Sequence, residues 1–189
     1  SRQQTLNITG YLDEIEDEIW TNAGALGARL RASRDTIGVF RIGTNYAVQD
    51  LLAGDDRTAV NTVTVRLSQG LPGFGTGNNN PNPSRPGERV DFTKVDMQIS
   101  RTQTLFEPWR DASVALEGLM AGQVTNKPLP SVEKFYLGGS QFTRGFWSGE
   151  VTGDQALVWT AELQLNTGLD VTLSHRPINF AAQFYLFYD

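Results

Sequence analysis

The sequence has no cysteine and only one histidine among its 189 residues. Disulfide bonds and cysteine-ligated metal sites are therefore excluded. A catalytic triad or a metal site built on histidine would have to use His175, which precedes Pro177 near a predicted turn. Acidic residues outnumber basic ones by 21 to 16, so the broad positive surface that binds nucleic acids is not expected.

The sequence also lacks any run of about 18 apolar residues, which excludes a transmembrane helix. Its first residues do not show the charged and then apolar pattern of a signal peptide. Both ends fall inside predicted strands, so we expect the chain to be part of a longer protein. The mean hydropathy of -0.32 would normally suggest a soluble protein. A β-barrel with a wet interior also has a low value, because only alternate residues face lipid.

Most of the chain alternates between apolar and polar residues with a period of two, as two-faced strands do. The strands predicted from this alternation cover residues 4–12, 25–34, 38–48, 59–70, 91–103, 109–123, 156–166 and 178–189. Each is about nine to fourteen residues long, whereas soluble strands cluster near five or six and a tilted membrane strand needs about nine to eleven. Length and alternation together predict an all-β fold, an antiparallel transmembrane β-barrel. A soluble β-sandwich or β-helix is the alternative.

Two stretches do not follow the alternation. Residues 13–19 contain five acidic residues and are predicted to be a solvated loop. Residues 71–89 are rich in glycine, proline and asparagine and are predicted to be a long irregular loop. If the motif region described below is extracellular, we expect the 71–89 loop on the periplasmic side, where such barrels usually have short turns.

The same alternation assigns the arginines to the polar or the apolar face of their strands. Arg29, Arg31 and Arg66 fall on the polar face of their strands and are expected to face the barrel interior. Arg101 falls on the apolar face. We expect it either to lie near a membrane interface, where a long side chain can reach water, or to follow a bulge that shifts the phase.

An ordered series of short motifs occupies the region from residue 135 to residue 163. The motifs are, in chain order, Phe135-Tyr136-Leu137-Gly138-Gly139, Thr143-Arg144-Gly145-Phe146, Gly153-Asp154 and Glu162-Leu163. This series resembles the signature of the two-partner secretion transporters, the TpsB or haemolysin secretion/activation family of ShlB, FhaC and HecB. That family shares an outer-membrane barrel superfamily with the insertase BamA. The ending Phe187-Tyr188-Asp189 also resembles the Phe-x-Asp strand of the family.

The resemblance implies a fold and a site. Residues 1–189 would be part of a C-terminal transmembrane barrel of roughly sixteen strands, without the preceding POTRA domains and the remaining strands. The Arg-Gly-aromatic motif would lie on a lid loop that folds back into the barrel. Arg144 would pair with Asp189 on the barrel wall, because a guanidinium can grip a carboxylate through two parallel bonds. Gly145 would allow a sharp turn, and Phe146 would help to seat the loop tip.

The function implied by the resemblance is a pore in the outer membrane of Gram-negative bacteria. It would carry a large partner protein of the haemolysin or adhesin type, unfolded during passage, to the cell surface. The expected partners are this secreted protein and the outer-membrane lipid and lipopolysaccharide. No enzyme activity, cofactor, metal or nucleic acid is expected. Two alternatives are an insertase of the same superfamily and a soluble β-rich adhesin or carbohydrate-binding module.

Overall fold

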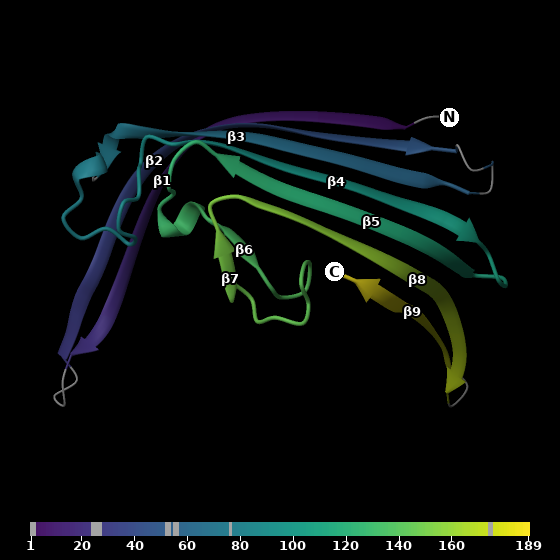
Figure 1. Cartoon of the computed structure of the whole chain (residues 1–189). Coiled ribbons are helices and arrows are strands. Elements are labelled where there is room, and N and C mark those ends of the chain that lie inside the picture. The colour runs from purple at the N-terminus through teal and green to yellow at the C-terminus, as the bar shows by residue number, and fades with distance from the viewer. Residues whose placement is uncertain (1–2, 24–27, 52–53, 55–56, 76, 174–175) are drawn as a thin grey trace.

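The computed structural model describes the chain except for residues 1–2, 24–27, 52–53, 55–56, 76 and 174–175. His175 therefore lies outside the described residues. The main feature is one antiparallel sheet of seven strands in the order β1-β2-β3-β4-β5-β8-β9. The sheet curls like part of a barrel wall, and the segment between β5 and β8 lies inside the curve (Figure 1).

The elements follow one another along the chain with simple connections. The strands of the main sheet are β1 (Gln4–Ala23), β2 (Ala28–Asp50), β3 (Ala59–Gly75), β4 (Thr93–Phe106), β5 (Ala112–Thr125), β8 (Ala156–Leu173) and β9 (Arg176–Tyr188). The smaller elements are the 3-10 helices η1 (Gly77–Asn79) and η2 (Ser131–Glu133) and the strands β6 (Phe135–Leu137) and β7 (Val151–Gly153). In the described residues, β6 and β7 form the second sheet, so no second layer covers the main sheet as it would in a sandwich. The prediction of an all-β barrel wall is confirmed.

No helix among the described residues is long and apolar enough to cross a membrane.

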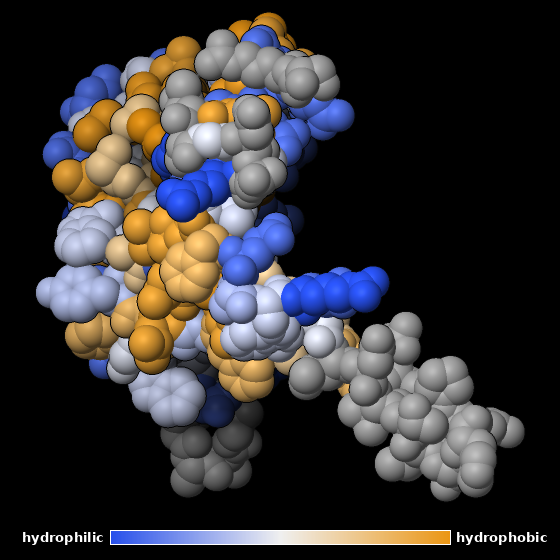
Figure 2. Space-filling model, turned by 90° about the vertical axis from the view of Figure 1, so that its right-hand side faces the viewer, coloured by the Kyte–Doolittle hydropathy of each residue, from blue (hydrophilic) through white to orange (hydrophobic). Residues whose placement is uncertain are grey.

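The convex face of the sheet is covered with exposed apolar side chains, because alternate residues of every strand point to the same side. The large hydrophobic residues in this phase, all at least 36 % exposed, include Leu6, Ile8, Leu12, Phe40, Ile42, Leu67, Met97, Ile99, Leu116, Met120, Leu157, Trp159, Leu163, Phe184 and Leu186. Figure 2 faces the end of the molecule with the β4–β5 and β8–β9 turns and shows hydrophobic residues gathered there. An apolar surface this large needs lipid or another protein against it.

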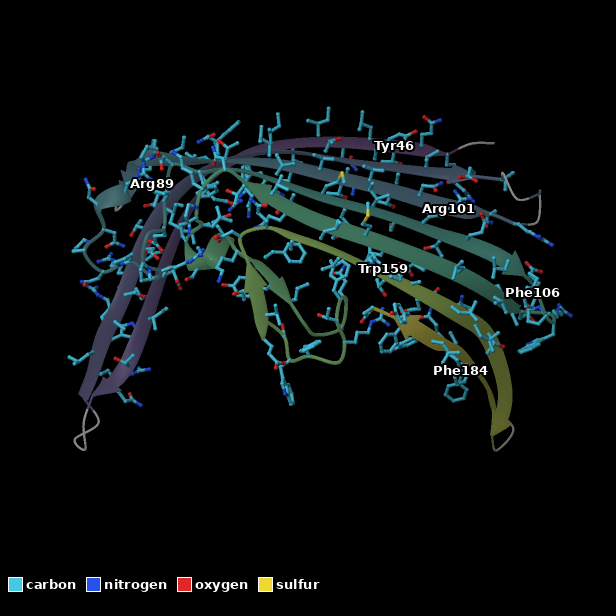
Figure 3. The ribbon with its side chains drawn as sticks, viewed as in Figure 1. Tyr46, Arg89, Arg101, Phe106, Trp159 and Phe184 are labelled. Carbon is cyan, nitrogen blue, oxygen red and sulfur yellow. The ribbon has the colours of Figure 1, made fainter. Side chains whose placement is uncertain are left out.

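Polar residues mark one edge of this apolar band. On the convex face Arg101 donates hydrogen bonds to Asp50 at 3.0 Å and to Asn61 at 2.7 Å. The pairing of β3 with β4 shows no register shift, so Arg101 does not follow a bulge there and lies at the polar edge of the apolar band. Arg101 lies at the opposite end of the sheet from Arg89 (Figure 3). In β2 the outward residues are apolar or uncharged from residue 40 to residue 48. This stretch of about nine residues has the length of a tilted membrane strand.

The acidic run marks the other edge, and its assignment to a loop was wrong. Residues 13–19 belong to β1, which pairs with β2 up to its last residue. Glu16 and Glu18 form ion pairs with Arg34 and Arg31 at 2.5 and 3.0 Å. Charges on both faces place this part of the β1–β2 hairpin beyond the apolar band. Arg29 and Arg31 therefore lie in the projecting hairpin and not in the barrel interior, and the two strands predicted at 25–34 and 38–48 are the single strand β2.

The position of the glycine- and proline-rich loop was also predicted wrongly. β3 continues to Gly75, which pairs with Ile37 across a register shift, so the irregular part lies beyond Gly75. β4 and β5 alone separate this loop from the motif region, so both leave the sheet at the same end. The connection at the other end, between β4 and β5, is short, as barrels of this kind require.

Met97→Arg should destabilise the membrane-inserted sheet by about 2–4 kcal/mol, because a charge in the middle of the band would face lipid. Met97 is aligned with the centre of the apolar part of β2 through Val65 and Thr44. The neighbouring Gln98→Arg is the matched control, since residue 98 faces the concave side. The measurement is the urea midpoint in liposomes, and equal losses in the two variants would contradict this assignment of faces.

Candidate functional site

Residues 126–155, between β5 and β8, form a lid on the concave face of the sheet. Its hairpin pairs Phe135 with Gly153 and Leu137 with Val151. Beyond the strands, the Gly139 N–H donates to Phe146 O at 3.1 Å, and the Gly149 N–H donates to the Leu137 carbonyl at 2.9 Å. Residues of the predicted signature therefore build the hairpin that presents the tip, residues 140–148.

The glycine pair of the signature has a steric cause. Gly138 has φ +101°, and a Cβ on it would lie 2.0 Å from the carbonyl oxygen of Trp147. Gly139 also has a positive φ of +94°. A side chain at Gly138 would force the two arms of the hairpin apart, and one at Gly139 would be strained by its backbone conformation.

The sharp turn at the tip falls on Thr143 and not on Gly145 as expected. Thr143 has φ 52°, and its carbonyl accepts a hydrogen bond from Phe146 N at 2.9 Å. Gly145 is not in the left-handed region, and a Cβ there would meet nothing within 4 Å. A left-handed conformation costs a β-branched residue about 1–2 kcal/mol, so the contacts on either side of Thr143 must hold it.

Arg144 lies against the inner wall, between β8 and β9. Its Nη1 donates to Glu162 Oε2 at 2.7 Å, and its backbone N–H donates to Asp189 Oδ2 at 2.8 Å. Arg144 Nε lies 3.8 Å from the same Asp189 oxygen, an ion-pair distance that is too long for a hydrogen bond. The side chains of all three residues are mostly buried. The two-bond grip on Asp189 is therefore not formed, and Arg144 bridges two carboxylates instead.

Aromatic rings complete the seat of Arg144. The guanidinium carbon lies 4.1 Å from the ring centroid of Phe187 and 5.7 Å from that of Tyr185, both on β9. Phe187 pairs in register with Glu162, so the ring and the carboxylate lie side by side. Cation–π contacts of this kind add to the ion pairs. In the sequence, these two aromatics on the inward phase of a barrel strand were the signal that could have revealed the seat.

Phe142, which the sequence reasoning missed, seats the tip in place of Phe146. Its side chain is buried against Leu119 and Ala121 of β5 and is covered by Phe135 and Leu137 of the hairpin. Phe146 is 51 % exposed. The tip is thus held by one buried ring and one bridging arginine.

The root of the lid, residues 126–134 with 154–155, has a separate attachment at Glu133. This carboxylate is only 2 % exposed and meets Arg41 Nη2 at 2.5 Å and Lys94 Nζ at 2.8 Å. Burial alone would raise the pKa of Glu133, but the bonds from Arg41 and then the charge of Lys94 lower it below its usual value. Arg41 also donates to Asp13 at 2.8 Å, which balances the second positive charge.

Asp154 of the signature lies at the root of the lid, whereas Arg144 lies at its tip. Arg85 Nη1 donates to both of its oxygens, at 2.5 and 2.7 Å, and the Leu129 N–H donates to Asp154 at 3.3 Å. Burial opposes ionisation, but the Arg85 bond outweighs it, and the pKa of Asp154 is lowered. The structure therefore brings Arg144, Glu162 and Asp189 together and gives Asp154 a different contact.

The loop that carries Arg85, residues 76–92, is itself fixed to β2 through carboxyl groups. Asp35 is fully buried and accepts hydrogen bonds from Asn80 Nδ2 at 2.6 Å and Ser84 N at 3.1 Å. Glu88 accepts from Ser84 Oγ at 2.9 Å. Burial, and then the carboxylate of Asp35, raise the pKa of Glu88 to about 7.

A curled antiparallel sheet with an apolar convex face, and a lid fixed to its concave wall, defines an outer-membrane β-barrel architecture. The model of the haemolysin secretion/activation protein family ShlB/FhaC/HecB matches residues 20–189, and the chain belongs to this family. The family consists of two-partner secretion transporters, so membership indicates a role in protein transport. A search of the curated proteins found no match, and neither did a search of the solved structures.

Gly138→Ala should loosen the lid hairpin by at least about 1–2 kcal/mol, because the new Cβ meets a carbonyl oxygen in a left-handed conformation. Hydrogen–deuterium exchange of residues 136–150 should then be faster. Gly145→Ala is the matched control and should leave the exchange unchanged, since the space around Gly145 is open. Slow exchange in the Gly138 variant would show that the hairpin tolerates a side chain there.

Docking of loop 76–92 should weaken as the pH rises from about 4.5 to about 7, and the loss should level off above that. Glu88 has a raised pKa in the docked loop, so the docked state binds more protons than the released state across this window. Protection factors of the amides of residues 80–92, measured between pH 5 and pH 8, should fall accordingly. Glu88→Gln should remove the pH dependence, and an unchanged profile in that variant would assign it to another group.

Proposed function

We propose that the chain forms part of a pore in the outer membrane of Gram-negative bacteria that exports a partner protein to the cell surface. The lid is the gate of this pore, and the attachment of Arg144 to the inner wall is the observation that carries the proposal. Membership in the ShlB/FhaC/HecB family supports it. The apolar band of the convex face would contact lipid and the lipid part of lipopolysaccharide.

The chemistry of the concave wall suits an unfolded passenger. Its side chains satisfy one another in short polar pairs, such as Asn45 with Thr64 at 2.9 Å and Gln164 with Glu117 at 2.7 Å. Arg66 also lines this face, beside Lys94 and Asp96. Such a wall offers an extended chain hydrogen bonds that water can replace, and little apolar surface on which it would be retained.

The lid tip can act as a gate because its attachment is strong but local. Removing one partner from a buried ion pair costs about 3–5 kcal/mol, since the other charge is left without compensation. Glu162 lies on β8 and Asp189 directly follows the neighbouring β9, and without Arg144 their charges would repel each other. A passing chain must displace Arg144 into water. Folding of the partner outside the cell would supply the energy for its passage.

Arg144→Ala should abolish or strongly reduce secretion of the partner protein, while the barrel still assembles in the membrane, because a tip without its seat on the wall stays loose in the lumen, in the path of the passenger. Arg144→Lys should restore secretion only in part, because an ammonium cannot bond Glu162 and lie flat on Phe187 as a guanidinium does. The measurement is the amount of partner in the medium, relative to the amount of folded barrel in the outer membrane.

Arg110→Ala is the matched control, since its side chain is 96 % exposed and its ion pair is with the adjacent Asp111. It should secrete normally. Normal secretion by Arg144→Ala would contradict the proposed role of the lid. A defect in the assembly of other outer-membrane proteins, with partner secretion intact, would favour the insertase instead.

A further inference from the structure

Two segments that are far apart in the chain meet at the root of the lid. Loop 76–92 reaches the root through the Arg85–Asp154 ion pair already described. Two backbone contacts reinforce it: Ser131 N donates to Ser84 Oγ at 3.2 Å, and Arg89 N donates to the Pro128 carbonyl at 2.9 Å. These bonds reach both segments of the root, the one before the β6–β7 hairpin and the one after it.

The two segments also share an apolar core. Leu129 of the root is fully buried together with Val90 and Phe92 of the loop. The same cluster contains Ile37 and Val39, which point inward from β2. Separating the loop from the root would expose this cluster to water, at a cost that rises with the apolar area uncovered.

The sheet provides a site shaped for the loop. Gly70 of β3 donates its N–H to the Phe92 carbonyl at 2.8 Å, and a Cβ on Gly70 would lie 1.9 Å from the Val90 oxygen. On the other side, Arg34 N donates to the Asn82 carbonyl at 3.0 Å. The loop is therefore fixed to the wall at two places before it reaches the lid.

The attachments of the root and of the tip have no residue in common. The root is held by loop 76–92 and by the buried Glu133, which lies between Arg41 and Lys94. The tip is held by Glu162 and Asp189 and by the buried ring of Phe142. We propose that loop 76–92 is a positioning element for the lid, with Arg85 and Asp154 as its positioning residues. The loop makes the lid a hinged flap whose tip can leave the wall while its root stays docked.

A hinged flap has a defined path of opening, because the tip turns about the root and returns to the same seat. A lid that loop 76–92 did not hold would leave the wall as a whole. Its root and its tip would then each have to dock again. The use of the flap as a gate rests on the proposed function. The attachment of the flap by loop 76–92 does not, and it can be tested without transport.

Pulsed EPR distances in the reconstituted transporter test the hinge. The sequence has no cysteine, so introduced cysteines can carry spin labels at chosen positions. One pair joins the tip at Trp147, which is 85 % exposed, to the convex wall at Leu67. The other joins the root at Gln155 to the same wall position. The two distance distributions are recorded in the original background, in Arg144→Ala, in Arg85→Asp and in the charge swap Arg85→Asp with Asp154→Arg.

We expect Arg144→Ala to broaden the tip distribution, which the ring of Phe142 alone cannot keep narrow, and to leave the root distribution unchanged. Arg85→Asp should broaden the root distribution, since Glu133 and Leu129 still hold part of the root, and the charge swap should narrow it again, which a general folding defect would not allow. Arg89→Ala is the matched control in the same loop, since Arg89 pairs with Asp91 and only its backbone reaches the lid. It should leave both distributions unchanged.

The hinge is overturned if Arg85→Asp leaves the root distribution narrow, if the swap fails to restore it, or if Arg144→Ala releases the root as well. A failure of the gate is distinguishable from these outcomes. If Arg144→Ala secretes normally but separates tip from root in the distances, the hinge holds and the proposed function is wrong.

Discussion

A strand in a bilayer must bond its backbone to its neighbours and must place its side chains alternately in lipid and in the lumen. The rest of this structure depends on that constraint. The outward half of each strand forms the apolar band, so every polar contact that holds the lid has to come from the inward half. Arg41, Lys94 and Glu162 all lie on that phase, and each meets the lid. Where the band ends, the constraint ends too, and the β1–β2 hairpin has charges on both faces.

Buried charge on the concave wall is compensated locally, in two separate groups. Glu133 lies between two cations, and Arg41 has Asp13 as a further partner. Arg144 lies between the carboxylates of Glu162 and Asp189 and over an aromatic ring. Ion pairs that are enclosed in this way contribute to position more than to stability, because desolvation offsets much of their attraction. The lid is therefore placed by charge and held by the apolar contacts of Phe142 and Leu129.

The sequence was informative where one face of a strand was apolar, and much less so elsewhere. Alternation located the membrane strands, and the ordered motifs located the lid and its arginine. The acidic run was misread because outside the band a strand no longer alternates, so β1 lost its signal at residue 13. The contact of Glu133 with Arg41 joins positions 92 residues apart and leaves no local pattern. Thr143 was missed because glycine is the usual residue for a left-handed turn, and Gly145 stood two positions away.

The backbone of Thr143 has a consequence for the energetics of the gate. A threonine in the left-handed region is strained, and the strain is relieved once the tip leaves its seat and the turn can relax. Part of the free energy lost with the Arg144 contacts is then returned by the backbone. If the lid is the gate we propose, its released and seated states are therefore closer in free energy than the ion pairs alone would suggest.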